Sequence, residues 1–356
     1  MKKLNSFNIA WLFAGCFLGA GFVSGQELWQ FFGEFSSWGI AGLVISITLL
    51  SVLGLMIIRT AALSDTGEMD KVIISDGPKF LGFLAGALQW VFMIGVVVIM
   101  IAGAGELIEM MTGIDHRVGG AVFTFFLALL ALLGTSGVSS VFSVCVPVIT
   151  VMSVIFSVVS LIKFEPEPVG SVSGTNDLLP GWGIAAVTYA AYNIFSSIGI
   201  LSPFGKSVKE RKTAVKGIVL GGLVLLVISL SILSALRNRP SSLEASLPML
   251  KIATDISFAA GCVYAVLLMG GLLGTSLSCL VAVKTFAEAK SEKIRKFRVI
   301  FTVLLGAVCY LLSLVGFADL IGTVYPIFGY ISAVFMLLMT FNYIKIVHEN
   351  RKGTHL

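Results

Sequence analysis

Residues 16–25 read Cys-Phe-Leu-Gly-Ala-Gly-Phe-Val-Ser-Gly and lie inside the first apolar segment of the chain. Three glycines, Gly19, Gly21 and Gly25, fall within seven residues, although each glycine in a helix interior costs about 1 kcal/mol relative to alanine. Irregular backbone is tolerated at membrane depth only where it is buried in protein or lines a cavity, and in transporters such breaks hold substrate and ions. The stretch therefore predicts a broken membrane helix that forms half of a binding site.

The composition is that of an integral membrane protein. Of the 356 residues, 57% are hydrophobic and 12% charged, and the mean hydropathy is +1.00, whereas a typical soluble domain has about 25% charged residues. Nine runs contain no Asp, Glu, Lys or Arg, and each reaches the length of about 20 residues that a spanning helix needs. These runs are 4–26, 35–58, 80–105, 118–162, 178–205, 217–236, 256–283, 299–318 and 320–344.

The longest of these runs predicts two helices, because the residues Gly-Thr-Ser-Gly at 134–137 interrupt it. We therefore expect ten spans in a single transmembrane domain that covers residues 1–356, embedded in a lipid bilayer. The expected spans are 7–31, 37–62, 79–111, 119–135, 138–163, 179–204, 213–237, 252–287, 297–316 and 320–346.

The distribution of basic residues predicts how these helices are oriented. If Lys2 and Lys3 lie in the cytoplasm, 19 of the 24 Lys and Arg residues fall in cytoplasmic segments and 5 outside. This asymmetry is typical of a multi-pass protein of the cell membrane, here with both termini in the cytoplasm. The net charge of +5 therefore reflects topology and requires no nucleic-acid partner.

The spans divide into two halves at the loop 163–178, with five spans on either side. Because five is odd, the second half (179–346) starts on the opposite side of the membrane from the first half (7–163), and a repeat would be inverted. A shift by 178 residues places 20–24 (Ala-Gly-Phe-Val-Ser) on 198–202 (Ile-Gly-Ile-Leu-Ser). The N-terminal run imitates a signal peptide, but we expect it to be retained, because its removal would leave nine spans and destroy this symmetry.

The sixth span carries a polar patch near its middle, made of Asn193, Ser196, Ser197 and Gly199, with Pro203 further on. Small and hydroxyl residues of this kind are common where membrane helices pack, so helix packing is one interpretation. The position of the patch, in the first span of the second half, favours another. We expect this helix to be broken like the first and to line the ligand site.

The eighth span places three hydroxyl groups, those of Thr275, Ser276 and Ser278, beside glycines. A hard cation prefers oxygen ligands, so this cluster is a candidate ion site, completed by carbonyl groups freed in the first span. Alternatively, the hydroxyls donate to carbonyls of the preceding helical turn.

Two carboxylates fall close to the predicted membrane region. Glu27 directly follows the break in the first span, and Glu106 lies toward the outer end of the third. Acidic residues inside a membrane are expensive and usually functional, so both are candidates for a gating or proton-carrying role. The alternative is that they lie at the interface and are solvated by water.

Together these features resemble the amino acid–polyamine–organocation superfamily with the LeuT-type fold, and residues 19–27 resemble the YkvI family of membrane proteins. The resemblance covers nearly the whole chain. It implies an all-α membrane protein of ten transmembrane helices, arranged as a five-plus-five inverted repeat, with helices 1 and 6 broken at mid-membrane. It also implies a cation-coupled secondary transporter of a small solute, such as an amino acid or a related carboxylate, that works by alternating access.

The resemblance also implies which residues bind the ion and the solute. It implies a sodium ion between the helix 1 carbonyls of Gly15 and Leu18 and the hydroxyls of Thr275 and Ser276, with Ser278 as a further ligand. A solute carboxylate would meet the amides of Leu18, Gly19, Ala20, Gly21 and Phe22, and Tyr192 would cover the solute. Phe22 stands where some members have an asparagine for a second sodium ion, which makes that second site doubtful.

The sequence leaves several functional alternatives open. Some proton-coupled relatives replace sodium with a lysine of helix 5, but Lys163 lies at the outer end of that helix, which favours sodium. Proton coupling through Glu27 or Glu106, a ligand sensor on the same fold and a passive channel are the alternatives. No nucleophile–base pair suggests an enzyme, and we expect no cofactor besides the coupling sodium. A monomer and a homodimer are both compatible with the sequence.

Overall fold

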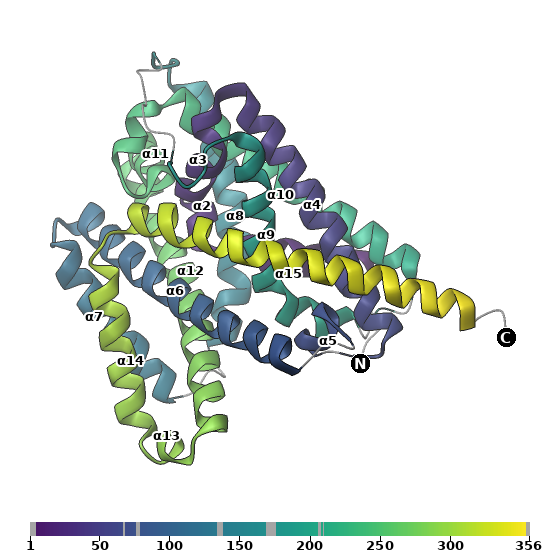
Figure 1. Cartoon of the computed structure of the whole chain (residues 1–356). Helices are drawn as coiled ribbons and strands as arrows, with labels where there is room; N and C mark the ends of the chain where they lie inside the picture. The colour runs from purple at the N-terminus through teal and green to yellow at the C-terminus, as the bar shows by residue number, and fades with distance from the viewer. Residues whose placement is uncertain are drawn as a thin grey trace.

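The computed structural model describes residues 5–66, 68–75, 79–133, 138–168, 176–205, 208 and 210–353. Helices make up the described chain, and no strand occurs within these ranges (Figure 1). The predicted interruption at 134–137 lies outside the described residues.

The helices follow the expected spans closely. The first half contains α1 (Ser6–Phe17), α2 (Ala20–Val23), α3 (Gln26–Phe32), the 3-10 turn η1 (Gly33–Phe35), α4 (Ser36–Leu63), α5 (Met69–Ile73), α6 (Lys79–Thr112), α7 (His116–Leu133) and α8 (Val138–Lys163). The second half contains α9 (Trp182–Gly205), α10 (Arg211–Asn238), the 3-10 turn η2 (Pro240–Glu244), α11 (Pro248–Ile256), α12 (Phe258–Lys290), α13 (Glu292–Lys296), α14 (Arg298–Ser313) and α15 (Phe317–Gly353).

The lengths and hydropathy of these helices are those of a multi-pass membrane protein. Six stretches of the described chain are long and apolar enough to cross a bilayer: Gln26–Leu63, Phe80–Thr112, Trp182–Pro203, Arg211–Asn238, Phe258–Glu288 and Phe317–Asn350. Four shorter apolar helices, Ser6–Phe17, His116–Leu132, Pro147–Lys163 and Arg298–Ser313, coincide with the other expected spans. The count of ten spans and the inverted repeat remain predictions.

The predicted break in helix 1 is confirmed, and the helix breaks twice. Leu18 and Gly19 separate α1 from α2, where Gly19 has extended backbone angles. Ser24 and Gly25 separate α2 from α3, and Gly25 has a φ of 85°, in the left-handed region that favours glycine. Gly25 therefore has the conformational role that its cost in a helix suggests.

The predicted break in helix 6 is wrong, because α9 runs without interruption from Trp182 to Gly205. Its polar side chains are satisfied by the helix itself: Asn193 Nδ2 donates to the Tyr189 carbonyl, and the hydroxyls of Ser196 and Ser197 donate to carbonyls three residues before them. Side chains that bond back in this way need no freed backbone groups.

The eighth span also starts later than predicted. Residues 252–256 belong to α11, and the extended residue Ser257 separates this short helix from α12. The Ser257 hydroxyl accepts a hydrogen bond from the Ala260 N–H and so caps α12. The consequence is a separate element, α11, that packs against α12 and α8.

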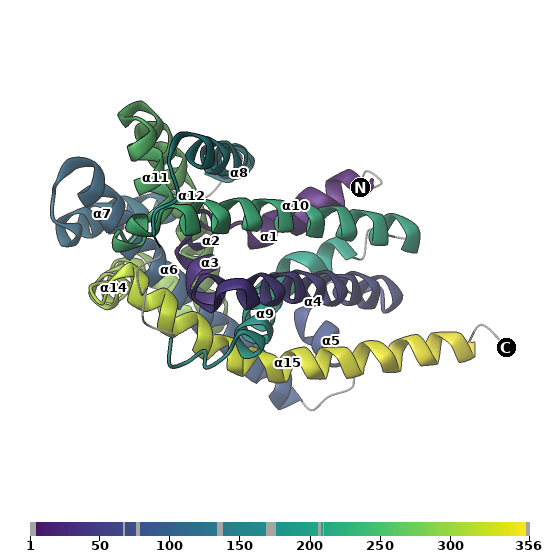
Figure 2. The same ribbon diagram turned by 90° about the horizontal axis from the view of Figure 1, so that it is seen from above.

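The packing places α9 at the centre of the helices that matter for the site. Helix α9 lies against α4 on one side and α15 on the other, α1 lies along α10, and α12 lies along α6 and α8 (Figure 2). The core contains large buried aromatic side chains such as Phe13, Phe31 and Tyr189. Large apolar side chains that remain exposed, such as Phe125 on α7 and Leu304 on α14, suit a surface covered by lipid.

Candidate functional site

The break after α1 leaves backbone carbonyls without partners. The Leu18 N–H donates to Ala14, and the Gly19 N–H donates to Phe17 over 2.9 Å, so no backbone N–H of the described chain bonds the carbonyls of Gly15 and Leu18. A Cβ atom built on Gly15 or Gly19 would meet no other atom within 4 Å. The break therefore borders open space, as a ligand site requires.

Glu27 lies in the first turn of α3 and reaches back toward this break. The residue is only 5% exposed. Its carboxylate accepts a hydrogen bond from the Tyr192 hydroxyl of α9, a residue 165 positions away in sequence. On the other side, a Cβ atom on Gly21 would lie 2.8 Å from Glu27 Oε2. Only glycine at this position leaves the carboxylate where it is.

Aromatic rings from four helices surround the Glu27 carboxylate. Tyr192 stacks on Tyr325 of α15, with ring centroids 4.8 Å apart and an angle of 14°. Tyr189 meets Phe31 of α3 edge-on at 5.3 Å, and Phe92 of α6 lies 6.4 Å from both Tyr192 and Tyr325. All five side chains are buried. We call Phe31, Phe92, Tyr189, Tyr192 and Tyr325 the aromatic box.

The Glu27 carboxylate beside the aromatic box has no cationic partner among the described residues. Tyr189, Tyr325 and Asn193 also lie near this carboxylate. The Tyr189 hydroxyl is buried, but no contact of regular hydrogen-bond distance and angle satisfies it in the described chain. The box therefore presents an acid and an unused hydroxyl without a positive group.

The structure separates the two predicted gating or proton candidates. Glu106 lines a cavity of about 10 Å³ together with His116, Tyr310 and Gly316, away from the aromatic box. Such a cavity has room for about one water molecule. Only Glu27 lies beside the helix 1 break.

The predicted ion ligands lie on α12, a helix that packs against α2. Ser276 is buried and its hydroxyl donates to the Leu272 carbonyl over 2.7 Å, while the Ser278 hydroxyl donates to Gly274 over 2.8 Å. A hydroxyl that donates keeps oxygen lone pairs for a cation. The sodium site formed with Thr275 and the helix 1 carbonyls remains a prediction.

Four residues of the box were not predicted: Phe31, Phe92, Tyr189 and Tyr325. One sequence signal could have identified Tyr189, because it lies three residues before Tyr192 and residues at this spacing share a helix face. The others are aromatic residues in apolar helices, where most such residues only pack. Gly199, predicted with the polar patch, lies on an exposed part of α9.

The second break is covered by α11. The Met249 N–H of α11 donates to the Ser24 carbonyl over 2.9 Å, and the Tyr264 hydroxyl of α12 donates to the Val23 carbonyl over 2.6 Å. The side chains of Met249, Leu236 and Ile232 fill the space beside Gly25. The break is therefore sealed on the side of α11, which the predicted topology places outside the cell.

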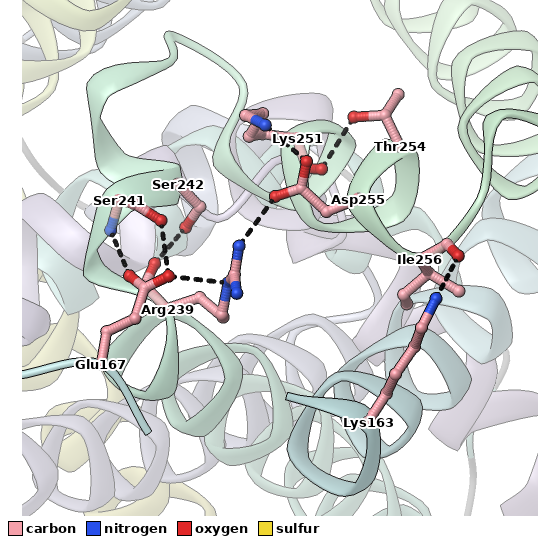
Figure 3. Close-up of polar contacts among 9 residues, drawn as sticks. All are labelled: Lys163, Glu167, Arg239, Ser241, Ser242, Lys251, Thr254, Asp255 and Ile256. Atoms are coloured by element: carbon pink, nitrogen blue, oxygen red, sulfur yellow. Dashed lines mark hydrogen bonds and ion pairs between the residues drawn. The ribbon is translucent and has the colours of Figure 1, made fainter. Parts of the chain in front are cut away.

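A network of charged residues holds α11 in this position (Figure 3). Arg239 lies between two acids, 3.1 Å from Glu167 and 3.2 Å from Asp255, and Lys251 also pairs with Asp255. Lys163, at the end of α8, donates to the Ile256 carbonyl over 2.6 Å.

Glu167 also bonds the turn that precedes α11. Its carboxylate accepts hydrogen bonds from the Ser241 N–H over 3.0 Å and from the Ser241 hydroxyl over 2.9 Å. The backbone N–H is the main cause that lowers the pKa of Glu167 below its ordinary value, and the Arg239 charge adds to it. The ionised form of Glu167 is thus the one that this turn stabilises.

Comparison with known proteins finds two that are similar to this chain over nearly its whole length. No protein-family model matches the chain. The membrane protein YkvI of Bacillus subtilis strain 168 is 28% identical over 349 residues, which cover 94% of this chain and 95% of YkvI. The protein YyaD of the same organism is 27% identical over 340 residues, which cover 92% and 94%. The predicted resemblance to YkvI is confirmed.

Solved structures show the same fold. The structure of MhsT in complex with L-phenylalanine matches with a TM-score of 0.63 and 14% identity, over 95% of this chain and 90% of MhsT. The inward-facing conformation of Mhp1 matches with a TM-score of 0.56 and 13% identity, over 95% and 76%. A manganese transporter of Eremococcus coleocola matches with a TM-score of 0.53 and 13% identity, over 96% and 86%. This chain thus has the LeuT-type fold, and these neighbours are transporters rather than enzymes.

Proposed function

We propose that the chain is a cation-coupled secondary transporter that moves a small solute across the cell membrane by alternating access. The observation that carries this proposal is the asymmetry of the helix 1 break. At Gly15 and Gly19 the break borders open space, whereas at Ser24 and Gly25 it is sealed by α11. A site that is open on one side and closed on the other is what alternating access requires.

The proposed solute is an amino acid or a related carboxylate. Helix α2 begins at Ala20, so the amides of residues 20–22 have no intrahelical acceptor, and such amides favour an anionic group. Tyr192, whose hydroxyl donates to Glu27 of α3, would cover the solute, with Asn193, Ser196 and Ser197 further along the same helix. The L-phenylalanine bound to MhsT, which shares the fold, is in keeping with this solute class.

The proposed coupling ion is sodium, held by Gly15, Leu18, Thr275, Ser276 and Ser278. In support, the carbonyls of Gly15 and Leu18 have no backbone donor in the described chain, and α12 packs against α2. A sodium ion there would stabilise the broken form of helix 1 and so favour the state that binds solute.

The test is uptake by the purified protein in liposomes. An inward sodium gradient should drive accumulation of a labelled amino acid from a mixed panel, and an equal potassium gradient should not. Replacing both hydroxyls (Thr275→Ala with Ser276→Ala) should reduce sodium-driven uptake about tenfold or more. A polar contact to a charged group contributes about 1.5–3 kcal/mol, and about 1.4 kcal/mol corresponds to a tenfold change in affinity. Thr302→Ala, which removes a hydroxyl from α14, is the matched control. Unchanged uptake in the double variant would remove the sodium site from the proposal.

A second candidate is proton coupling, which the burial of Glu27 favours. Intramembrane acids without a cationic partner commonly carry protons in transporters. In this case an inward pH gradient in sodium-free medium should drive uptake in the wild type and fail to do so in Glu27→Gln. Glu106, which lies outside the box, would then have no part in coupling.

A further inference from the structure

Glu27 places a carboxylate in the interior without a positive partner. The residue is 5% exposed, and its carboxylate accepts a hydrogen bond from the Tyr192 hydroxyl. A buried carboxylate is normally paired with a cation, because the interior replaces water poorly around a charge. The ion pairs of the described chain leave Glu27 out. Either a proton or a positive group from outside the protein must therefore balance this carboxylate.

The surroundings of the carboxylate select an organic cation over a bare metal ion. Metal ions such as calcium and magnesium take about six or more oxygen ligands, whereas the walls of the aromatic box are mainly ring carbon. Ring faces attract organic cations, above all when the group is desolvated, and aromatic cages around ammonium groups are the common form of this recognition. Tyr192 and Tyr325 stack on each other at 4.8 Å, so the faces left for a cation are their outer ones and that of Phe92 beside them.

One further group points to an N–H donor as the ligand. The Tyr189 hydroxyl is buried and lies near the Glu27 carboxylate, but no contact of regular hydrogen-bond distance and angle satisfies it in the described chain. An unpaired buried hydroxyl costs free energy that a ligand can recover. An ammonium group beside Glu27 would donate one N–H to the carboxylate and another to this hydroxyl.

We propose that Glu27 and the aromatic box bind the ammonium group of the transported solute. This inference rests on the proposed transport function and defines its solute class as one with a primary amine. Glu27 supplies the counter-charge, Tyr189 a second acceptor, and Tyr192 and Tyr325 the aromatic faces. Gly21 keeps this place free, because any side chain there would push the carboxylate away.

The experiment is equilibrium binding to the full-length protein in detergent, without sodium and without a gradient. Three amines (3-methylbutylamine, 2-phenylethylamine and methylamine) are compared with the matched acids that lack the amine (4-methylpentanoate, 3-phenylpropanoate and acetate), by thermal stabilisation and by isothermal titration. At least one amine should bind, and its matched acid should bind about tenfold more weakly or not at all. Absence of binding by every amine, or equal binding by amine and acid, overturns the proposal. This comparison uses the wild type alone and does not depend on how a variant folds.

The variant Glu27→Gln keeps the shape and removes the charge, so amine affinity should fall about tenfold or more. Tyr189→Phe should lower it by a smaller factor. Glu109→Gln, which neutralises an acid of α6 that lies outside the box, should bind like the wild type. If Glu27→Gln binds amines as well as the wild type, the proposal fails even if liposomes show transport. If amines bind through Glu27 but no flux is found, transport fails and the ammonium site stands.

Discussion

At the scale of single residues, Gly25 shows why the first helix is rich in glycine. Its φ of 85° lies in the left-handed region, where the Cβ atom of any other residue comes too close to the following carbonyl oxygen. A Cβ atom on Gly25 would also lie 3.0 Å from Leu236 and 3.1 Å from Met249, side chains of α10 and α11. Both the backbone angle and the packing therefore require glycine where α3 begins.

We predict that Gly25→Ala destabilises the protein by about 1–3 kcal/mol, the typical cost of a left-handed backbone for a residue other than glycine. The melting temperature of the purified protein in detergent measures the effect. Gly19→Ala is the matched control, because Gly19 has extended angles and open space around it, so this variant should melt close to the wild type. Equal melting temperatures for both variants would contradict the role given to Gly25.

Residue type alone predicted the break in helix 1 but not the continuity of helix 6. The glycines of residues 19–25 destabilise a helix and have no side chain whose packing or hydrogen bonds could offset this, so a break is expected there. Asn193, Ser196 and Ser197 look equally unfavourable in a sequence, yet their side chains bond carbonyls of their own helix. The contact between Glu27 and Tyr192 joins residues 165 positions apart, and no local pattern encodes it.

At the scale of elements, the position of α11 depends on the charged network around Arg239. The guanidinium group stacks over the Phe164 ring at 4.4 Å while it pairs with Glu167 and Asp255. This arrangement joins the end of α8, the end of α10 and α11 (Figure 3). Because these charges are partly exposed, each pair contributes little alone, and the network acts through several contacts together.

Glu167 makes this network sensitive to acid. Its pKa is lowered in the folded protein, chiefly by the Ser241 N–H. A lowered folded-state pKa means that the stabilisation is fully present above the unfolded-state pKa, about 4.3, and is lost as the pH falls through the folded-state value. We predict that Glu167→Gln lowers the melting temperature slightly at neutral pH, and that this difference disappears in strong acid.

The measurement compares melting temperatures of wild type and Glu167→Gln in detergent from neutral pH down to about pH 2, well below the usual glutamate range. Exposed Glu165 provides the control, since Glu165→Gln should show no such pH-dependent difference. A difference for Glu167→Gln that persists or grows in acid would show that charge on Glu167 does not stabilise the turn.

At the scale of the whole molecule, the structure closes the helix 1 break from one side only. Backbone contact between Met249 and Ser24 seals the second break, while Gly15 and Gly19 face open space at the first. Length and hydropathy predicted most of the helices to within a few residues, because charge-free runs of spanning length have few alternative structures in a bilayer. They could not predict α11, whose place is set by contacts between distant segments.

Alternating access requires that the contact between α11 and the second break open during each cycle. We predict that a disulfide between Ser24→Cys and Met249→Cys, in a background without the native cysteines, abolishes uptake into liposomes and that a reductant restores it. The two backbones lie within hydrogen-bond distance, 2.9 Å between the Met249 nitrogen and the Ser24 oxygen, so the Cα atoms are close enough for a bridge. Each single-cysteine variant under the same oxidant controls for damage. Uptake that continues in fully crosslinked protein would show that the solute does not pass on the α11 side.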